Sequence, residues 1–79
     1  MILNVFYVER VIEDLVGGFD DSIYIIDSDI NTLKLSINSV FDWESLADEL
    51  TDLFPQADFN FNVIGLDLII GWWIVWVIF

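Results

Sequence analysis

Asp67–Phe79, DLIIGWWIVWVIF, is the stretch of sequence that decides how this chain folds. It carries no charged residue after Asp67 and ends in eight consecutive apolar residues, Trp72–Phe79. Its β-branched and aromatic residues favour a buried strand over a helix. Because aromatic side chains bury about 150–250 Å² each, we expect this strand to supply much of a small core.

A membrane-spanning helix is the alternative interpretation of this stretch. Extended back to Val63, the apolar run has seventeen residues and is interrupted by Gly65, Asp67 and Gly71, whereas a spanning helix needs about 20 mostly apolar residues. No Lys or Arg follows Lys34 to orient a span, and Asp67 inside it would cost about 2.5–3.5 kcal/mol. The buried strand is therefore favoured over a membrane-associated protein.

The composition indicates one small acidic domain, residues 1–79. The chain is 57% hydrophobic and 16% aromatic, which excludes the disordered class. Fourteen Asp and Glu residues stand against Arg10 and Lys34, giving a net charge of −12. Such a charge repels nucleic acid, so we expect a basic protein partner and no direct nucleic-acid binding. The start of the chain lacks the basic segment of a secretory signal, which predicts a cytoplasmic protein.

The N-terminal residues predict a helix. Asn4 is a candidate N-cap for a helix that runs to about Val16, with apolar side chains on one side and charged ones on the other. Gly17 and Gly18 then end it. Ile2–Val8 is also rich in strand-forming residues, so a strand followed by a shorter helix is the alternative here.

A β-hairpin is expected next, with strands at Ser22–Asp27 and Thr32–Asn38. The second strand alternates apolar and polar residues, which places Leu33, Leu35 and Ile37 on one face. Asp and Asn side chains in the connection 27–31 are typical of a turn, because they bond their own backbone.

The same connection is a weak candidate for a metal site. Asp27, Asp29 and Asn31 match the first three ligand positions of a calcium loop. Thr32, however, stands where such a loop needs Gly, and Asn38 stands where it needs a bidentate Glu. An ordinary turn is therefore the favoured interpretation, and we expect no metal.

The second half of the chain predicts a helix and two strands. Asp42 is a candidate N-cap for a helix over Trp43–Phe54, which Pro55 ends. Ala57–Ile64 alternates as a half-exposed strand, and a bend at Gly65 or Gly71 would fold it against the terminal stretch. The order α-β-β-α-β-β describes an α+β domain, in which an antiparallel sheet carries two helices.

The residues needed for catalysis are scarce. With no His and no Cys, the chain lacks the usual general base, the thiolate nucleophile and the commonest metal ligands. Pairs of carboxylates arise by chance among fourteen acids, and so small a chain offers little cleft for a substrate. We therefore expect a protein that is not an enzyme and has no cofactor.

The outer face of the second helix carries the most informative charge pattern. Glu44, Asp48 and Asp52 follow one another at four-residue spacing, which places their carboxylates about 6 Å apart along the helix axis. A solvated face is the alternative, yet no Lys or Arg is interleaved among these acids. We expect a larger partner-binding acidic surface that also includes Asp42, Glu49, Glu9, Glu13, Asp14, Asp20 and Asp21.

As a whole, this chain resembles the small acidic DNA-mimic inhibitors that phages and mobile elements encode, of the anti-restriction and anti-CRISPR type. The resemblance lies in size, in the sign and arrangement of charge and in the missing catalytic residues, and it involves no diagnostic motif. It implies binding to a basic, nucleic-acid-binding protein of host defence, in the cytoplasm of a bacterial or archaeal host cell. The alternative is a structural or oligomer-forming module whose acidity serves solubility.

The position of the terminal strand decides whether the chain needs a second copy. If this strand lay at a sheet edge, its open backbone groups would favour a homodimer through the C-terminal strand. Because the run is apolar on both pleat faces, we expect a central position with both faces covered. Trp73 and Val75 should then face one side, and Trp72, Ile74 and Trp76 the other, with at least one of the two sets packed under the helices. Trp76→Ala is expected to cost about 3–5 kcal/mol.

Overall fold

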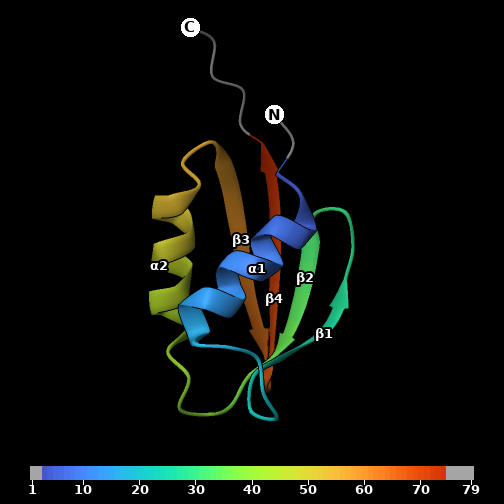
Figure 1. The fold of residues 1–79 in the computed structure, drawn as a ribbon, viewed down its shortest axis with the longest axis vertical. Coiled ribbons are helices and arrows are strands. Elements are labelled where there is room, and N and C mark those ends of the chain that lie inside the picture. Colours follow the sequence, from blue (N-terminus) through green and yellow to red (C-terminus); the bar gives the residue numbers. More distant parts are fainter. Residues whose placement is uncertain (1–2, 75–79) are drawn as a thin grey trace, which may run out of the picture.

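The computed structural model describes residues 3–74, which form two helices and one four-stranded antiparallel sheet (Figure 1). In chain order the elements are α1 (Val5–Val16), β1 (Tyr24–Ser28), β2 (Thr32–Ser36), α2 (Trp43–Leu53), β3 (Ala57–Ile64) and β4 (Asp67–Ile74). The strand order across the sheet is β1-β2-β4-β3. The α+β class and the order α-β-β-α-β-β are thus confirmed.

β4 lies inside the sheet, between β2 and β3, as expected from its apolar sequence. Asp67–Gly71 pairs with β2, and all of Asp67–Ile74 pairs with β3. Asp67–Gly71 therefore has no open edge through which a second copy could pair. The expectations for Val75 and Trp76 lie outside the described residues.

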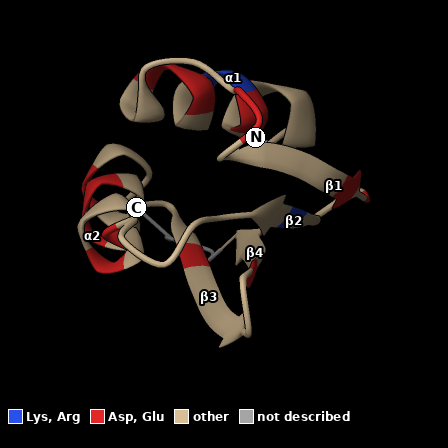
Figure 2. Cartoon of the chain, turned by 90° about the horizontal axis from the view of Figure 1, so that it is seen from below, with Lys and Arg blue, Asp and Glu red and all other residues tan. Residues whose placement is uncertain are grey.

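The two faces of β4 have different surroundings. Trp72 is 2% exposed and belongs to the core that the helices cover, whereas Trp73 is 54% exposed. The two side chains thus point to opposite faces, and one set packs under the helices, as expected. The expectation that both faces are covered is wrong for the described part of the chain, because α1 and α2 lie on the same side of the sheet (Figure 2). An antiparallel sheet tolerates one solvated face, and here that face carries polar residues from the neighbouring strands, including Lys34 and Asn60.

α1 begins and ends at capping residues. The Asn4 side chain accepts a hydrogen bond from the Phe6 N–H at 2.8 Å. At the other end Gly17 has a φ of 81°, and the Gly18 N–H donates to the Glu13 carbonyl at 2.8 Å. These bonds satisfy backbone groups that a helix leaves open at its ends. Within the described residues the alternative of an N-terminal strand reaching Val8 is therefore wrong.

α2 has the expected N-cap and ends one residue early. The Asp42 carboxylate accepts a hydrogen bond from the Ser45 N–H at 3.2 Å. The helix stops at Leu53 because Pro55 disfavours helical geometry in the residue before it, and Phe54 has a φ of −126° and a ψ of 69°. Leu46 and Leu50 point into the core.

The strand boundaries differ slightly from the expected ones. β1 begins at Tyr24, two residues late, because Asp20 holds Ser22 and Ile23 in a turn through their backbone N–H groups. β2 ends at Ser36, since the N–H of Ile37 turns to the Leu66 carbonyl at 2.8 Å.

A two-residue turn at Gly65 and Leu66 joins β3 to β4. Gly65 has a φ of 62°, which a residue with a side chain rarely adopts. Ile64 and Asp67 pair on either side of the turn. The bend is therefore at Gly65, while Gly71 lies inside β4 opposite Thr32.

The core lies between the sheet and the two helices. Its largest side chain, Trp72, donates a hydrogen bond from its indole N–H to the Leu3 carbonyl at 3.2 Å. The Trp72 ring lies 6.1 Å from the Phe59 ring, and Phe59 lies 6.0 Å from Phe54. Phe54 in turn contacts Tyr7 of α1 edge-on at 5.7 Å. These aromatic contacts join the central strand to both helices.

Candidate interaction surface

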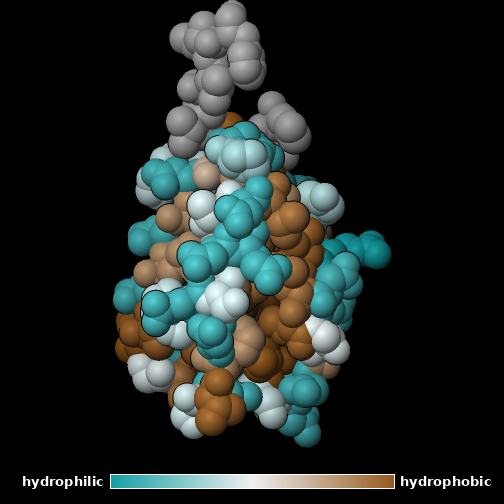
Figure 3. All heavy atoms as spheres, turned by 90° about the vertical axis from the view of Figure 1, so that its left-hand side faces the viewer, coloured by the Kyte–Doolittle hydropathy of each residue, from teal (hydrophilic) through white to brown (hydrophobic). Residues whose placement is uncertain are grey.

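The carboxylates of α2 form a row on the side of the helix that faces away from the core. Glu44, Asp48 and Asp52 are all exposed, whereas Leu46 and Leu50 of the same helix are buried. Hydrophilic residues gather over α2 on this side of the molecule, and apolar residues border them (Figure 3). The structure thus places the three acids where the helical spacing predicted, about 6 Å apart along the axis.

The acidic row has no basic neighbour. Among residues 3–74 the single ion pair joins Lys34 and Asp67, with 3.7 Å between the Lys34 Nζ and a carboxylate oxygen. That pair connects β2 to β4 and lies on the open face of the sheet, away from the helices. Arg10, on α1, forms no ion pair within the described residues. The charge of the α2 carboxylates is therefore not neutralised within this part of the chain.

α1 adds further acids to the helical side of the molecule. Glu13 and Asp14 are exposed near its C-terminal end, and Glu9 is half-buried. Figure 2 shows that both helices contain acidic residues. Leu15, the residue after Asp14, lines the same groove as Glu49 of α2. Of the predicted acids, Asp42 and Glu49 line this groove, whereas the acids of α1 do not.

Three of the predicted acids lie at or near turns. Asp20 accepts hydrogen bonds from the backbone N–H groups of Ser22 at 2.7 Å and Ile23 at 3.1 Å. Asp42 caps α2 through Ser45. Asp21 is exposed in the bend after Asp20. Asp20 and Asp42 thus have a structural role that the eight other predicted acids, including Glu44 and Asp48, do not have in the described structure.

In the hairpin turn that was a weak calcium candidate, the Asp side chains accept hydrogen bonds from backbone N–H groups. Asp27 accepts a hydrogen bond from the N–H of Ser28 at 2.9 Å, and Asp29 accepts one from Ile30 at 2.7 Å. Asn31 bonds the hydroxyl of Thr32 at 3.4 Å. No group of three Asp or Glu side chains that could hold a metal ion occurs within residues 3–74. These contacts support the interpretation as an ordinary turn.

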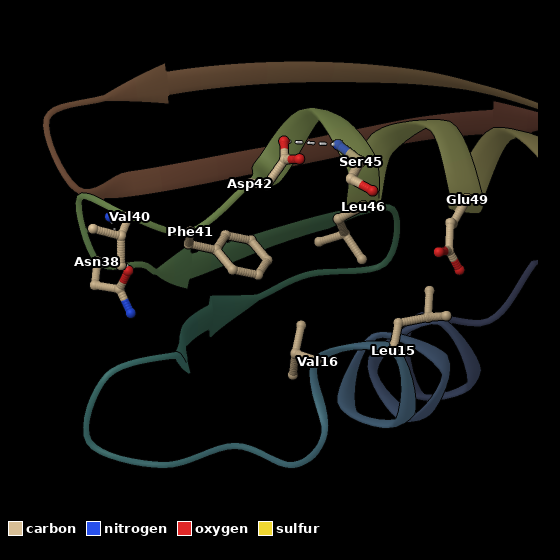
Figure 4. Close-up of a pocket in the computed structure, with 9 residues that line it drawn as sticks. All are labelled: Leu15, Val16, Asn38, Val40, Phe41, Asp42, Ser45, Leu46 and Glu49. Atoms are coloured by element: carbon tan, nitrogen blue, oxygen red, sulfur yellow. Dashed lines mark hydrogen bonds between the residues drawn. The ribbon is translucent and has the colours of Figure 1, made fainter.

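A groove between the two helices is the feature that the sequence did not indicate. It has a volume of about 410 Å³ and lies between the C-terminal end of α1 and the N-terminal half of α2 (Figure 4). The connection between β2 and α2 supplies the remaining wall. Because three separate segments form the groove, no local sequence pattern could have revealed it. Its lining residues are Leu15, Val16, Asn38, Val40, Phe41, Asp42, Ser45, Leu46 and Glu49.

The described residues offer no enclosed site for acid–base chemistry. No charged or polar residue between positions 3 and 74 is buried, whereas active sites tune their carboxylates by burial and by close charged neighbours. Within the same range, neither helix has the length and apolar character that crossing a membrane requires. The charged side chains of this range are therefore exposed or half-buried.

Comparison with known proteins adds no relative. No protein-family model, curated protein or solved structure matches this chain. The functional argument therefore depends on the residues and their geometry.

Proposed function

We propose that this protein is an interaction protein that mimics the phosphates of a nucleic acid and inhibits a nucleic-acid-binding enzyme of host defence, of the anti-restriction or anti-CRISPR type. The observation that carries the proposal is the row formed by Glu44, Asp48 and Asp52, which is exposed, regularly spaced and without a basic neighbour in the described structure. The protein acts by occupying a basic surface and needs neither catalysis nor a cofactor.

The energetics of the row support a role beyond solubility. Like charges at four-residue spacing on a helix cost a few tenths of a kcal/mol per pair. Asp52 also lies near the C-terminal end of α2, where the helix dipole disfavours negative charge. A Lys at any of these positions would remove the repulsion and still keep the surface hydrophilic. An acidic row that costs stability is expected where a partner supplies the missing positive charge.

Inhibition follows from competition for the same basic groups. A protein that binds nucleic acid neutralises phosphates with Lys and Arg, which gives most of its non-specific affinity. Carboxylates at similar spacing attract the same side chains, and a net charge of −12 accelerates the encounter. While the inhibitor is bound, the enzyme's nucleic-acid channel is blocked.

Reversing the charge of the residues in the row tests the proposal. The triple variant Glu44→Lys, Asp48→Lys, Asp52→Lys should retain its fold, since exposed substitutions usually change stability by less than about 0.5 kcal/mol each. It should fail to capture the basic proteins that the wild-type chain captures from a nuclease-treated bacterial lysate. A matched control is available in single variants: Asp48→Lys should weaken capture, whereas Asp58→Lys, on the open face of the sheet, should leave it nearly unchanged.

The same experiment separates the alternative function. If the acids serve only solubility, the triple variant should lose solubility and should capture the same proteins as the wild type. Equal capture by a folded triple variant would therefore contradict the proposal and favour a structural module.

A further inference from the structure

The groove between α1 and α2 combines an apolar wall with a carboxylate rim. Leu15 and Val16 project into it from the last turn of α1, and Leu46 and Phe41 form the opposite side (Figure 4). Glu49 faces Leu15 across the groove in the same view. The groove is thus apolar inside and acidic along the α2 edge.

The helices leave the groove open because their aromatic contact lies elsewhere. Tyr7, in the first turn of α1, contacts Phe54, just after α2, with 5.7 Å between the rings. At the opposite end of the helix pair, Leu15 remains 36% exposed and Val40 is 88% exposed. Apolar side chains are therefore accessible to solvent at the place where the groove opens.

We propose that this groove binds one large apolar side chain, carried on the basic segment of a partner protein with Lys or Arg on either side. This inference rests on the proposed function and specifies how the partner is recognised. The groove, with a volume of about 410 Å³, has room for such a side chain. Asp42 and Glu49 at its rim are placed to contact the Lys or Arg residues on either side of that side chain.

Charge complementarity decides which occupant the groove accepts. Glu49 and Asp42 line it, and the exposed acids Glu44 and Asp48 continue along the same helix. A second copy of this chain would bring its own charge of −12 against these acids, and an anionic lipid would be repelled in the same way. An apolar side chain flanked by cations can make apolar contacts with the wall and ion pairs with the carboxylates of the rim.

An apolar side chain bound in the groove (an anchor) lets the acidic surface select one partner among basic proteins, which charge alone does not. Exposed charges attract any basic surface and are screened within about 8 Å at physiological ionic strength. Burial of an apolar side chain is not screened by salt, and buried anchors dominate the affinity of many interfaces. The partner that fits the groove should therefore remain bound at salt concentrations that release other basic proteins.

Two synthetic peptides test the inference directly. One has the sequence Gly-Lys-Arg-Phe-Lys-Arg-Gly, and the other has glycine in place of phenylalanine, so that their charge is equal. Affinity is measured by NMR titration of the full-length protein at low and high salt. The phenylalanine peptide should bind at least about tenfold more tightly, should shift the signals of Leu15, Phe41 and Leu46, and should keep this advantage at high salt.

A pair of leucine variants provides the matched control. Leu15→Gln changes the groove wall, whereas Leu53→Gln changes a 53% exposed leucine in the last turn of α2, outside the groove. Neither substitution alters the net charge. Leu15→Gln should remove the preference for the phenylalanine peptide, and Leu53→Gln should preserve it.

The remaining outcomes overturn the inference in distinguishable ways. Equal binding of the two peptides to all variants would mean that the groove receives no anchor, while the charge-based function would stand. Failure of both peptides to bind at low salt would contradict the groove and the proposed function together. Groove signals that shift with protein concentration alone, or as strongly with the neutral detergent octyl glucoside as with the phenylalanine peptide, would show a second copy or an acyl chain as the occupant.

Discussion

Two adjacent tryptophans of β4 allow a stringent test of where the core lies. Trp72 is 2% exposed, contacts Phe59 and donates its indole N–H to the Leu3 carbonyl at 3.2 Å. Trp73, the next residue, is 54% exposed on the open face. Trp72→Ala should cost about 3–5 kcal/mol, which is a large share of the 5–15 kcal/mol that stabilises a typical domain. Trp73→Ala should cost less than about 1 kcal/mol, because surface side chains contribute little.

A milder variant keeps an aromatic ring at this position and removes the indole hydrogen bond. Trp72→Phe keeps an aromatic ring in the core but leaves the carbonyl of Leu3, which is 5% exposed, without its donor. The free energy of unfolding should fall by about 1–3 kcal/mol. Each kcal/mol lowers the Tm of a domain this size by about 4–8 °C.

Urea and thermal unfolding, followed by far-UV circular dichroism, measure all three variants against the wild type. The expected order of stability is wild type, Trp73→Ala, Trp72→Phe and finally Trp72→Ala. If Trp73→Ala destabilised the protein as much as Trp72→Ala, the assignment of the covered face would be wrong.

Three further expectations concern the backbone and the net charge. Gly65→Ala should lower stability by about 1–2 kcal/mol because its φ is 62°, whereas Gly71→Ala should be nearly neutral, since an added Cβ would meet only the Asn31 carbonyl oxygen at 4.0 Å; thermal melts of the two variants check this pair. Asp42→Ala should cost about 1 kcal/mol through loss of the α2 N-cap, measured by urea unfolding, and a neutral result would contradict the capping role. Raising NaCl from low to high concentration should raise the Tm, because it screens the repulsion within a chain of net charge −12; a Tm that falls with salt would contradict this.

Local signals in the sequence were sufficient to predict the elements of this fold. Asn4 and Asp42 act as N-caps where the expected helices begin, and Gly17 ends α1. The alternation in β2 correctly placed Leu33 and Leu35 in the core. These features depend on residues close to one another in the chain, so a single sequence contains the information.

Long-range packing explains what the sequence did not reveal. The apolar run through β4 led to the expectation of two covered faces, although coverage depends on where the helices pack, and both pack on the Trp72 side. The groove requires Leu15 and Phe41, residues of separate segments, to meet Leu46. The acidic row, in contrast, was predictable, because helical spacing alone places Glu44 and Asp48 on one exposed side.

Displacement of a captured partner by nucleic acid tests the central claim most directly. The wild-type chain is immobilised, loaded with basic proteins from a nuclease-treated bacterial lysate and then eluted with double-stranded DNA or with increasing NaCl. The proposed function predicts a nucleic-acid-binding protein that DNA releases, that leaves more readily as salt rises, and that the chain reversed at Glu44, Asp48 and Asp52 fails to capture. A partner that DNA does not displace, and that the reversed chain retains equally well, would contradict phosphate mimicry by α2.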